Sequence, residues 1–137
     1  MVIFLDTNIV IDYFSERPQS EIAKHIMERC VELNFAVCFS STTVVNCFYI
    51  MRKEFSVAEI KDLFFNLFTF ADIVGTSREN IIRSLHNSSF TDFEDCVQSG
   101  CADEVHADYI ITRNAKDFAA SKVTALSPED FLSKMAG

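Results

Sequence analysis

The chain has 137 residues, of which 49% are hydrophobic, and it carries a formal net charge of −8. A chain of this length is expected to form one domain, here residues 1–137, that buries roughly two-thirds of its unfolded surface. The acidic balance argues against broad, non-specific binding to a phosphate backbone, but it is compatible with a local nucleic-acid site and with a basic protein partner.

Short apolar runs alternate along the chain with segments that have helical periodicity. The runs are continuous and only a few residues long, which is typical of strands buried on both faces. We predict five strands, at residues 2–5, 36–39, 69–74, 109–112 and 123–126.

The segments between these runs carry apolar residues at helical spacing, mostly after side chains that can cap a helix. In chain order they are an apolar stretch at 9–14, a helix begun by Ser20, one capped within 40–43, one opened by the capping box Ser56–Glu59, one begun by Ser77, one at 93–105 capped by Thr91 or Asp92, and one opened by Ser127-Pro128. Alternating strands and helices predict a three-layer α/β/α sandwich with a mostly parallel sheet of four or five strands.

Five cysteines occur, an odd number, and no two have C-x-x-C spacing. They are expected to be small buried side chains in a reducing compartment rather than disulfides or zinc ligands. The N-terminus lacks the basic start and long apolar run of a signal peptide, and no segment approaches the roughly 20 apolar residues of a membrane span. We therefore expect a cytoplasmic protein without a membrane segment.

Three polar segments lie beside predicted strands or at a helix start. They contain Asp6 and Asn8, then Asp92 and Asp95, then Asn114 and Asp117. Loops that follow the strands of a parallel sheet gather at one edge, so these side chains could meet there. Clustered carboxylates without a basic partner repel one another unless a divalent cation lies among them. Such a site suits metal-assisted hydrolysis of a phosphodiester.

The first two segments also have simpler interpretations. Asp6 could do no more than cap the helix that follows it. Asp92 and Asp95 lie three residues apart in the first turn of a helix, where acids complement the helix dipole without any further role. Glu94 is expected to point elsewhere on that helix, into solvent.

The third segment lies at the end of the fourth predicted strand. Asn114 could provide a neutral oxygen ligand, and Asp117 a charged one or a contact through water. Asn8 and Thr112 are candidates to orient the ligands by hydrogen bonds. The simpler alternative is an ordinary polar turn.

Other chemistries have less support in the sequence. The histidines are scattered in polar helical stretches, and no Ser or Cys has an identifiable base, so a covalent nucleophile is not indicated. A phosphatase that used Asp6 as nucleophile would normally need a second Asp where Asn8 stands. Among the basic residues, Arg113 or Lys116 could meet a phosphate.

Taken together, the three segments resemble those of the PIN-domain ribonucleases, in particular toxins of the VapC type. The resemblance covers essentially the whole chain, and its carriers are FLDTN at 4–8, DFED at 92–95, and ADYIITRN with KDF between 107 and 118. It implies a PIN-like α/β/α fold, a Mg²⁺ or Mn²⁺ site and hydrolysis of RNA. It also implies a homodimer and a basic antitoxin that covers the site.

The resemblance also suggests roles for individual residues. Asp6 would be the first acid and Asp95 the third, and Asn114 or Asp117 would fill the fourth position. Asp92 would be a further ligand that acts directly or through water.

One position departs from the family pattern. The family usually has Glu in the helix after the second strand, and Asn46 lies at or near that position. Because Asn46 and Asn114 are neutral, the site is expected to hold its metal more weakly, or to hold one ion. Asp92 could partly compensate. The alternative function is a catalytically silent PIN-like module that binds RNA or a protein partner.

Overall fold

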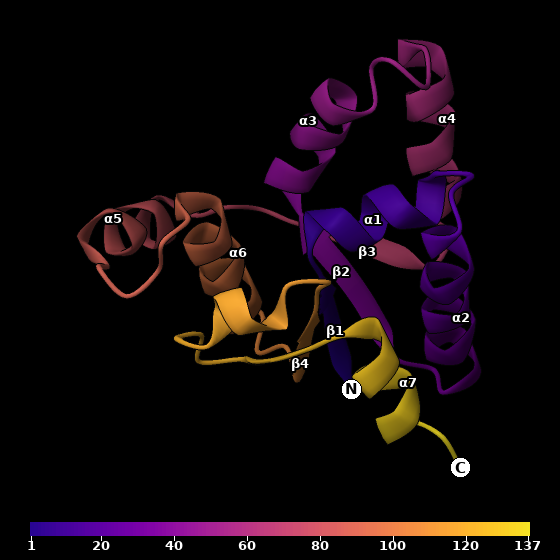
Figure 1. Cartoon of the computed structure of the whole chain (residues 1–137). Coiled ribbons are helices and arrows are strands. Elements are labelled where there is room, and N and C mark those ends of the chain that lie inside the picture. Colours follow the sequence, from indigo (N-terminus) through magenta and orange to yellow (C-terminus); the bar gives the residue numbers. More distant parts are fainter.

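The computed structural model describes all of residues 1–137 and contains one sheet of five parallel strands (Figure 1). The strands are β1 (Val2–Leu5), β2 (Ala36–Ser40), β3 (Ala71–Val74), β4 (Tyr109–Ile111) and β5 (Thr124–Leu126). Their order is β3-β2-β1-β4-β5, so β1 is central and Phe4 lies opposite both Cys38 and Ile110. The strand order reverses beside β1, and ligands bind at such a switch point, outside the carboxyl ends of the strands.

Seven α-helices and one 3₁₀ helix connect and follow the strands. They are α1 (Thr7–Phe14), α2 (Gln19–Glu32), α3 (Ser41–Ile50), α4 (Val57–Leu67), α5 (Arg78–His86), α6 (Phe93–Glu104), η1 (Ala115–Phe118) and α7 (Pro128–Lys134). The 3₁₀ helix η1 was not expected from the sequence, which indicated a polar loop there.

Most of the predicted caps are present. Ser40, Ser77 and Ser127 each accept a hydrogen bond from the backbone N–H three residues on, and both bonds of the Ser56–Glu59 capping box are formed. The prediction for Ser20 was wrong, because α2 begins at Gln19 and Ser20 lies buried inside it. Pro18 precedes that helix with φ −54° and ψ −32°, so the chain is already helical before Ser20 is reached.

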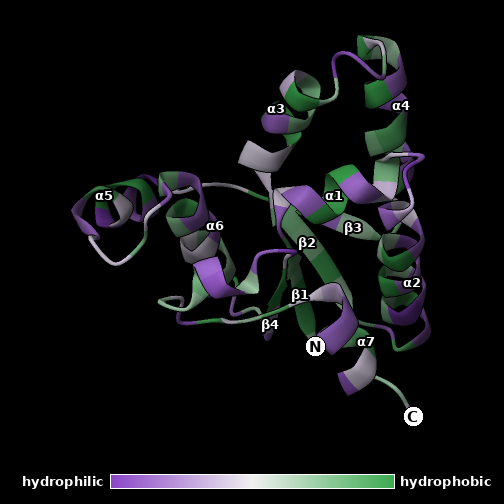
Figure 2. Cartoon of the chain, in the orientation of Figure 1, coloured by the Kyte–Doolittle hydropathy of each residue, from purple (hydrophilic) through white to green (hydrophobic).

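Alternate residues of the strands point to opposite faces of the sheet, and each face has its own core. The strands β1 and β2 at the centre of the sheet are mostly hydrophobic along their length (Figure 2). Ile3, Leu5 and Phe39 belong to a cluster of 19 buried residues that includes side chains of α1, α2, α3, α4 and α7. Phe4 and Ile110 belong to a cluster of 8 that packs chiefly against α6. The three-layer α/β/α sandwich predicted from the sequence is therefore confirmed.

The five cysteines are buried and unpaired, as expected. Burial raises the pKa of Cys47 to about 12 and that of Cys30 to about 11, so neither is a reactive thiolate near neutral pH. None of the helices is both long enough and apolar enough to cross a membrane.

Candidate functional site

Asp6 lies directly after the central strand and begins α1. Its Oδ1 accepts a hydrogen bond from the Thr7 backbone N–H at 2.9 Å, so it does cap the helix. Its Oδ2 accepts from the Thr112 hydroxyl at 2.8 Å and from the Asn8 amide at 3.2 Å. Only 5% of Asp6 is exposed. Asn8 and Thr112 thus orient this carboxylate, which lies at the end of β1 where the predicted site requires an acid.

Gln98 of α6 is a further partner of Asp6, and the sequence reasoning missed it. The side chain is fully buried, and its Nε2 lies 3.4 Å from Asp6 Oδ1 and 3.1 Å from each of the hydroxyls of Thr7 and Thr43. Its Oε1 is the one buried side-chain N or O atom without a hydrogen-bond partner. Its position could have indicated this role, because Gln98 is a large polar residue three positions after Asp95, on a helix that was expected to pack against the sheet.

Asp92 and Asp95 begin α6, as the sequence predicted. Asp92 is the N-cap, and its Oδ1 accepts from the Asp95 backbone N–H at 3.1 Å. Burial and, after it, the charges of Asp6, Asp92, Asp117 and Glu94 together raise the pKa of Asp95 to about 7. Carboxylates from all three polar segments therefore lie near enough to repel one another.

The expectation for Glu94 was wrong. Its side chain is half-buried, and its Oε1 accepts from the Thr7 hydroxyl at 3.3 Å. Burial raises the pKa of Glu94, the charges of Asp6 and Asp92 raise it further, and the side chains of Thr7 and Asn46 oppose that increase. Glu94 lies three and four residues before buried Val97 and Gln98, so it shares the face of α6 that packs against the sheet and α1.

Asn46 lies half-buried on α3, against Glu94. The helix after the second strand thus does bring an amide to the cluster, and a carboxylate from α6 lies beside it. The uncharged Asn46 consequently has an acidic neighbour that was not foreseen from the sequence.

The third polar segment divides between Asn114 and Asp117. Asn114 is exposed, and its backbone N–H donates to the Thr112 hydroxyl at 3.1 Å. Asp117 is also exposed, in η1, close enough to raise the pKa of Asp95. Asn114 lines the same hollow as Asp6 and Asp95, whereas Asp117 lies outside its lining.

These side chains surround a hollow of about 330 Å³ at the carboxyl end of β1. Its lining is Asp6, Thr7, Asn8, Ile11, Arg17, Ile50, Asp92, Glu94, Asp95, Arg113 and Asn114. Four carboxylates and two arginines thus line one hollow. Both arginines form ion pairs with other acids, Arg17 with Glu54 and Arg113 with Asp12.

The oxygen-rich lining fits a hard divalent cation better than any softer metal. The four carboxylates have no ion-paired base of their own, and a cation would relieve the repulsion that raises the pKa of Asp95. No three Asp, Glu, His or Cys side chains form a group that could hold a metal ion by themselves. Mg²⁺ usually keeps several waters and needs only one or two carboxylates, so the residues present fit such an ion.

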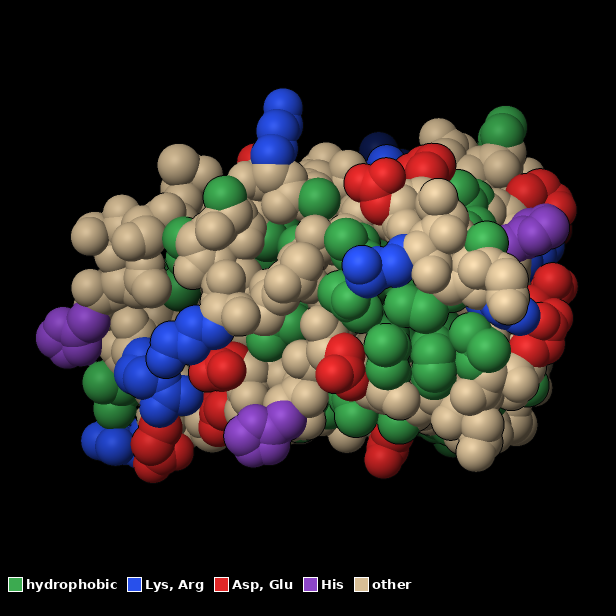
Figure 3. Space-filling model, turned by 90° about the horizontal axis from the view of Figure 1, so that it is seen from below, with side chains coloured by type: hydrophobic (Ala, Val, Ile, Leu, Met, Phe, Trp, Pro, Cys, Tyr) green, Lys and Arg blue, Asp and Glu red, His purple; other side chains and the backbone are tan.

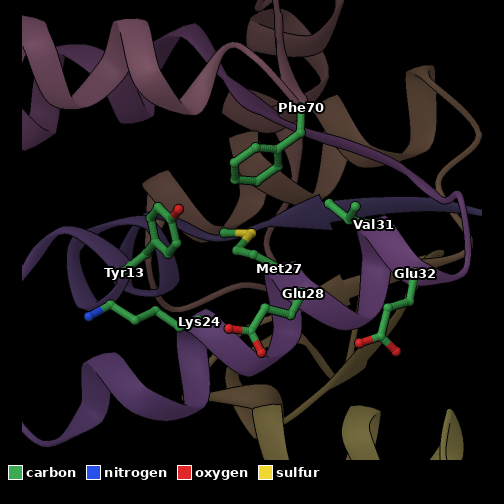
Figure 4. A pocket seen from close by; sticks show the side chains of 7 residues that line it. All are labelled: Tyr13, Lys24, Met27, Glu28, Val31, Glu32 and Phe70. Atoms are coloured by element: carbon green, nitrogen blue, oxygen red, sulfur yellow. The ribbon is translucent and has the colours of Figure 1, made fainter.

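A larger hollow of about 490 Å³ lies elsewhere, between α1, α2 and the chain before β3 (Figure 4). Tyr13, Met27 and Phe70 provide much of its apolar lining. Its charged residues all come from α2, and no carboxylates from different elements converge in it. The chemistry of a hydrolytic site is therefore found in the smaller, acidic hollow.

Comparison with known proteins identifies both a family and a set of structures with the same fold. The family model described as the PIN domain matches residues 2–116. Among curated protein sequences, none matches the chain.

Several solved structures share the fold at low sequence identity. VapBC2 from Rickettsia felis, bound to a DNA fragment from its promoter, is 16% identical with a TM-score of 0.71, and the match covers 93% of this chain and 98% of that one. A toxin–antitoxin complex from Klebsiella pneumoniae is 24% identical with a TM-score of 0.68, over 92% and 97% of the two chains. VapC20 from Mycobacterium tuberculosis, a toxin that cleaves the sarcin–ricin loop, is 11% identical with a TM-score of 0.62, over 79% and 86%. At these identities the likeness establishes a shared fold.

Proposed function

The chain belongs to the PIN domain family, and from this membership we propose that it is a divalent-metal-dependent ribonuclease that hydrolyses RNA phosphodiester bonds. The observation that carries the proposal is the convergence of Asp6, Asp92, Glu94 and Asp95 on one hollow beside the central strand. Carboxylates that repel one another in a shared hollow destabilise the folded protein, and a bound cation would replace this repulsion by attraction.

In the proposed site, Asp6 and Asp95 would hold Mg²⁺ or Mn²⁺. Asp92, Asn114 and Asp117 would contribute further ligands, directly or through water. When bound, such an ion lowers the pKa of a water molecule and stabilises negative charge on the scissile phosphate.

The chain's own residues would prepare the site for this ion. Thr112 and Asn8 hold Oδ2 of Asp6, and Thr7 and Gln98 donate to its Oδ1, so that carboxylate has one orientation. Asp95, with a pKa of about 7, keeps part of its proton near neutral pH in the free protein and gives it up when a cation binds. Metal affinity should therefore fall steeply below about pH 7.

A second candidate function is binding of RNA or protein without cleavage, and the neutral side chains of Asn46 and Asn114 favour it. Glu94 argues for the first candidate, because it brings a carboxylate to the side chain of Asn46. We accordingly include Glu94 among the acids of the active site.

The test is a cleavage assay on RNA of mixed sequence, in chelator and with added Mn²⁺ or Mg²⁺. We expect cleavage only with metal, products with a 5′-phosphate and a 3′-hydroxyl, and loss of cleavage in Asp95→Asn. A matched control is Asp130→Asn, because Asp130 is the third residue of α7 as Asp95 is of α6, but lies outside the acidic hollow. RNA binding without cleavage in any metal would favour the silent module.

We further propose that the protein is the cytoplasmic toxin of a toxin–antitoxin pair, with a basic antitoxin covering the acidic hollow. The acidic hollow and the net charge of −8 support a basic partner. A homodimer is supported by exposed apolar side chains on α3 and α4, among them Val45, Tyr49 and Phe65. The tests are inhibition and copurification by the product of a neighbouring small reading frame, and the mass of the purified chain in solution.

A further inference from the structure

Two arginines lie on the rim of the acidic hollow. Arg17 comes from the loop between α1 and α2, and Arg113 from the loop after β4, so they are far apart in the sequence. Their side chains are 55% and 46% exposed, so both remain within reach of a ligand in the hollow. Acids and bases that line one hollow can bind the two charges of a metal–phosphate pair.

A buried acid fixes one of these arginines. Asp12 of α1 has a side chain only 5% exposed, and its Oδ2 lies 2.9 Å from Arg113 Nε. Burial raises the pKa of Asp12, and the charges of Arg113 and then of Arg17 oppose that increase, so both guanidinium groups lie near this carboxylate. An ion pair through Nε leaves the four N–H groups of the terminal nitrogens of Arg113 for another acceptor.

Those terminal nitrogens have no hydrogen-bond partner within the protein, although the Arg113 backbone N–H donates to Asn8 at 3.2 Å. Asn8 in turn donates to Asp6. The backbone of Arg113 is thus linked through Asn8 to the carboxylate of Asp6, and its side chain is paired with Asp12.

Phosphate groups would have to be recognised by a few basic residues at one site, and not by an extended basic surface. The net charge is −8, and on the face in Figure 3 the Lys and Arg side chains are scattered among acidic ones and form no continuous basic surface. The rim of the acidic hollow brings two of the chain's twelve basic residues together.

We infer that Arg17 and Arg113 form a phosphate-binding subsite for the RNA backbone beside the acidic cluster, and that Asp12 positions Arg113 in it. The subsite rests on the proposed function, because it assigns part of that function's substrate binding. A guanidinium binds two phosphate oxygens at once when its plane is held in place, and the ion pair with Asp12 supplies that restraint.

The alternative is that Arg113 serves only to neutralise buried Asp12. Arg113→Gln alone would leave Asp12 charged and unpaired, and that variant could fail to fold. The double variant Asp12→Asn with Arg113→Gln avoids this difficulty, since it replaces an ion pair by two neutral amides. It also leaves the net charge unchanged, because it removes one acid and one base.

Arg17→Gln tests the other half of the subsite. Its partner Glu54 is 36% exposed, and exposed ion pairs contribute little to stability, so this variant should fold like the parent. Arg78→Gln is its matched control, because Arg78 is an exposed arginine on α5 whose loss changes the net charge equally.

The experiment measures binding of a labelled single-stranded RNA of mixed sequence in chelator, where metal-dependent cleavage is absent, over a range of salt concentrations. We expect Arg17→Gln and the double variant each to bind on the order of tenfold more weakly, and the salt dependence to fall by about 0.7 in log–log slope per lost phosphate contact. Arg78→Gln should bind like the parent. In Mn²⁺, the two rim variants should raise KM more than they lower kcat.

The outcomes separate this inference from the proposed function. If the parent binds and cleaves RNA but both rim variants bind it as tightly with the same salt slope, the subsite is wrong and the ribonuclease stands. If Arg78→Gln weakens binding as much as Arg17→Gln, general charge rather than a subsite explains the effect. If the parent neither binds nor cleaves RNA, the proposed function is wrong and the subsite is rejected with it.

Discussion

Replacing Asp95 by Asn should make the metal-free protein more stable at pH 8. In the folded chain the pKa of Asp95 is raised from 3.8 to about 7, chiefly by burial and then by its acidic neighbours. For a fully buried group this increase would correspond to roughly 4 kcal/mol in the free energy of unfolding. Asp95 is only half-buried, so solvent screening reduces the expected gain to about 1–2 kcal/mol.

The gain should depend on pH in a definite direction. The folded pKa of Asp95 lies above the unfolded one, so the folded state holds the proton more tightly. The parent therefore loses stability as pH rises from about 4 through about 7, and Asn at the same position does not titrate. Parent and variant should melt alike near pH 4 and separate by pH 8.

The assay is thermal unfolding in chelator at pH 4, 6 and 8, then repeated with Mn²⁺. The control Asp130→Asn removes an acid from the same position of α7, where the charge favours the helix dipole, and should destabilise by about 0.3–1 kcal/mol. With Mn²⁺ the parent should gain more stability than Asp95→Asn, because binding to the folded state stabilises it. An Asp95→Asn variant that melts below the parent in chelator at pH 8 would refute the repulsion that defines the proposed site.

Three further changes test other parts of the site and fold. Asn46→Glu should tighten Mn²⁺ binding in calorimetric titration and lower the stability of the protein in chelator, because it places a second carboxylate beside Glu94. If neither this variant nor Asn46→Asp changes the affinity for Mn²⁺, position 46 is not part of the site. Gln98→Leu should lower the free energy of unfolding, measured with denaturant, by about 1–3 kcal/mol, because it removes a buried donor to Asp6 and to the hydroxyls of Thr7 and Thr43. An unchanged free energy of unfolding would mean that these hydrogen bonds do not contribute to stability. Ser56→Ala should cost about 1 kcal/mol by removing the cap of α4, measured the same way, with no effect on RNA cleavage.

The five strands and most helix starts could be predicted from the sequence because their causes are local. A run such as Val2–Leu5 is apolar on every residue, and Ser56 and Glu59 close a capping box within four residues. The start of α2 was not predicted correctly, because Pro18 already has a helical backbone conformation and the helix therefore begins at Gln19, before Ser20.

The sequence also indicated that Asp6, Asp95 and Asn114 could meet, and the structure brings all three to one hollow. This followed from a rule of topology rather than from contacts, since loops after parallel strands share an edge. The roles of these residues in metal binding remain predictions, which the Asp95→Asn comparison addresses.

Only the tertiary structure decided which way α6 faces. The buried side of this helix includes Gln98 and Ser99 as well as Cys96 and Val97, so its hydrophobic pattern does not specify a face. Packing of α6 on the sheet therefore determined that Glu94 points toward Thr7 and Asn46 instead of into solvent.

The ion pair of Asp12 with Arg113 was equally beyond the sequence, because the two residues lie about a hundred positions apart and nothing local links them. Local interactions thus determined the elements and the placement of Asp6 at the end of a strand. The packing of helices on the sheet decided which charges surround the hollow, since an ion pair or hydrogen bond between distant residues exists only when their backbones are already in place.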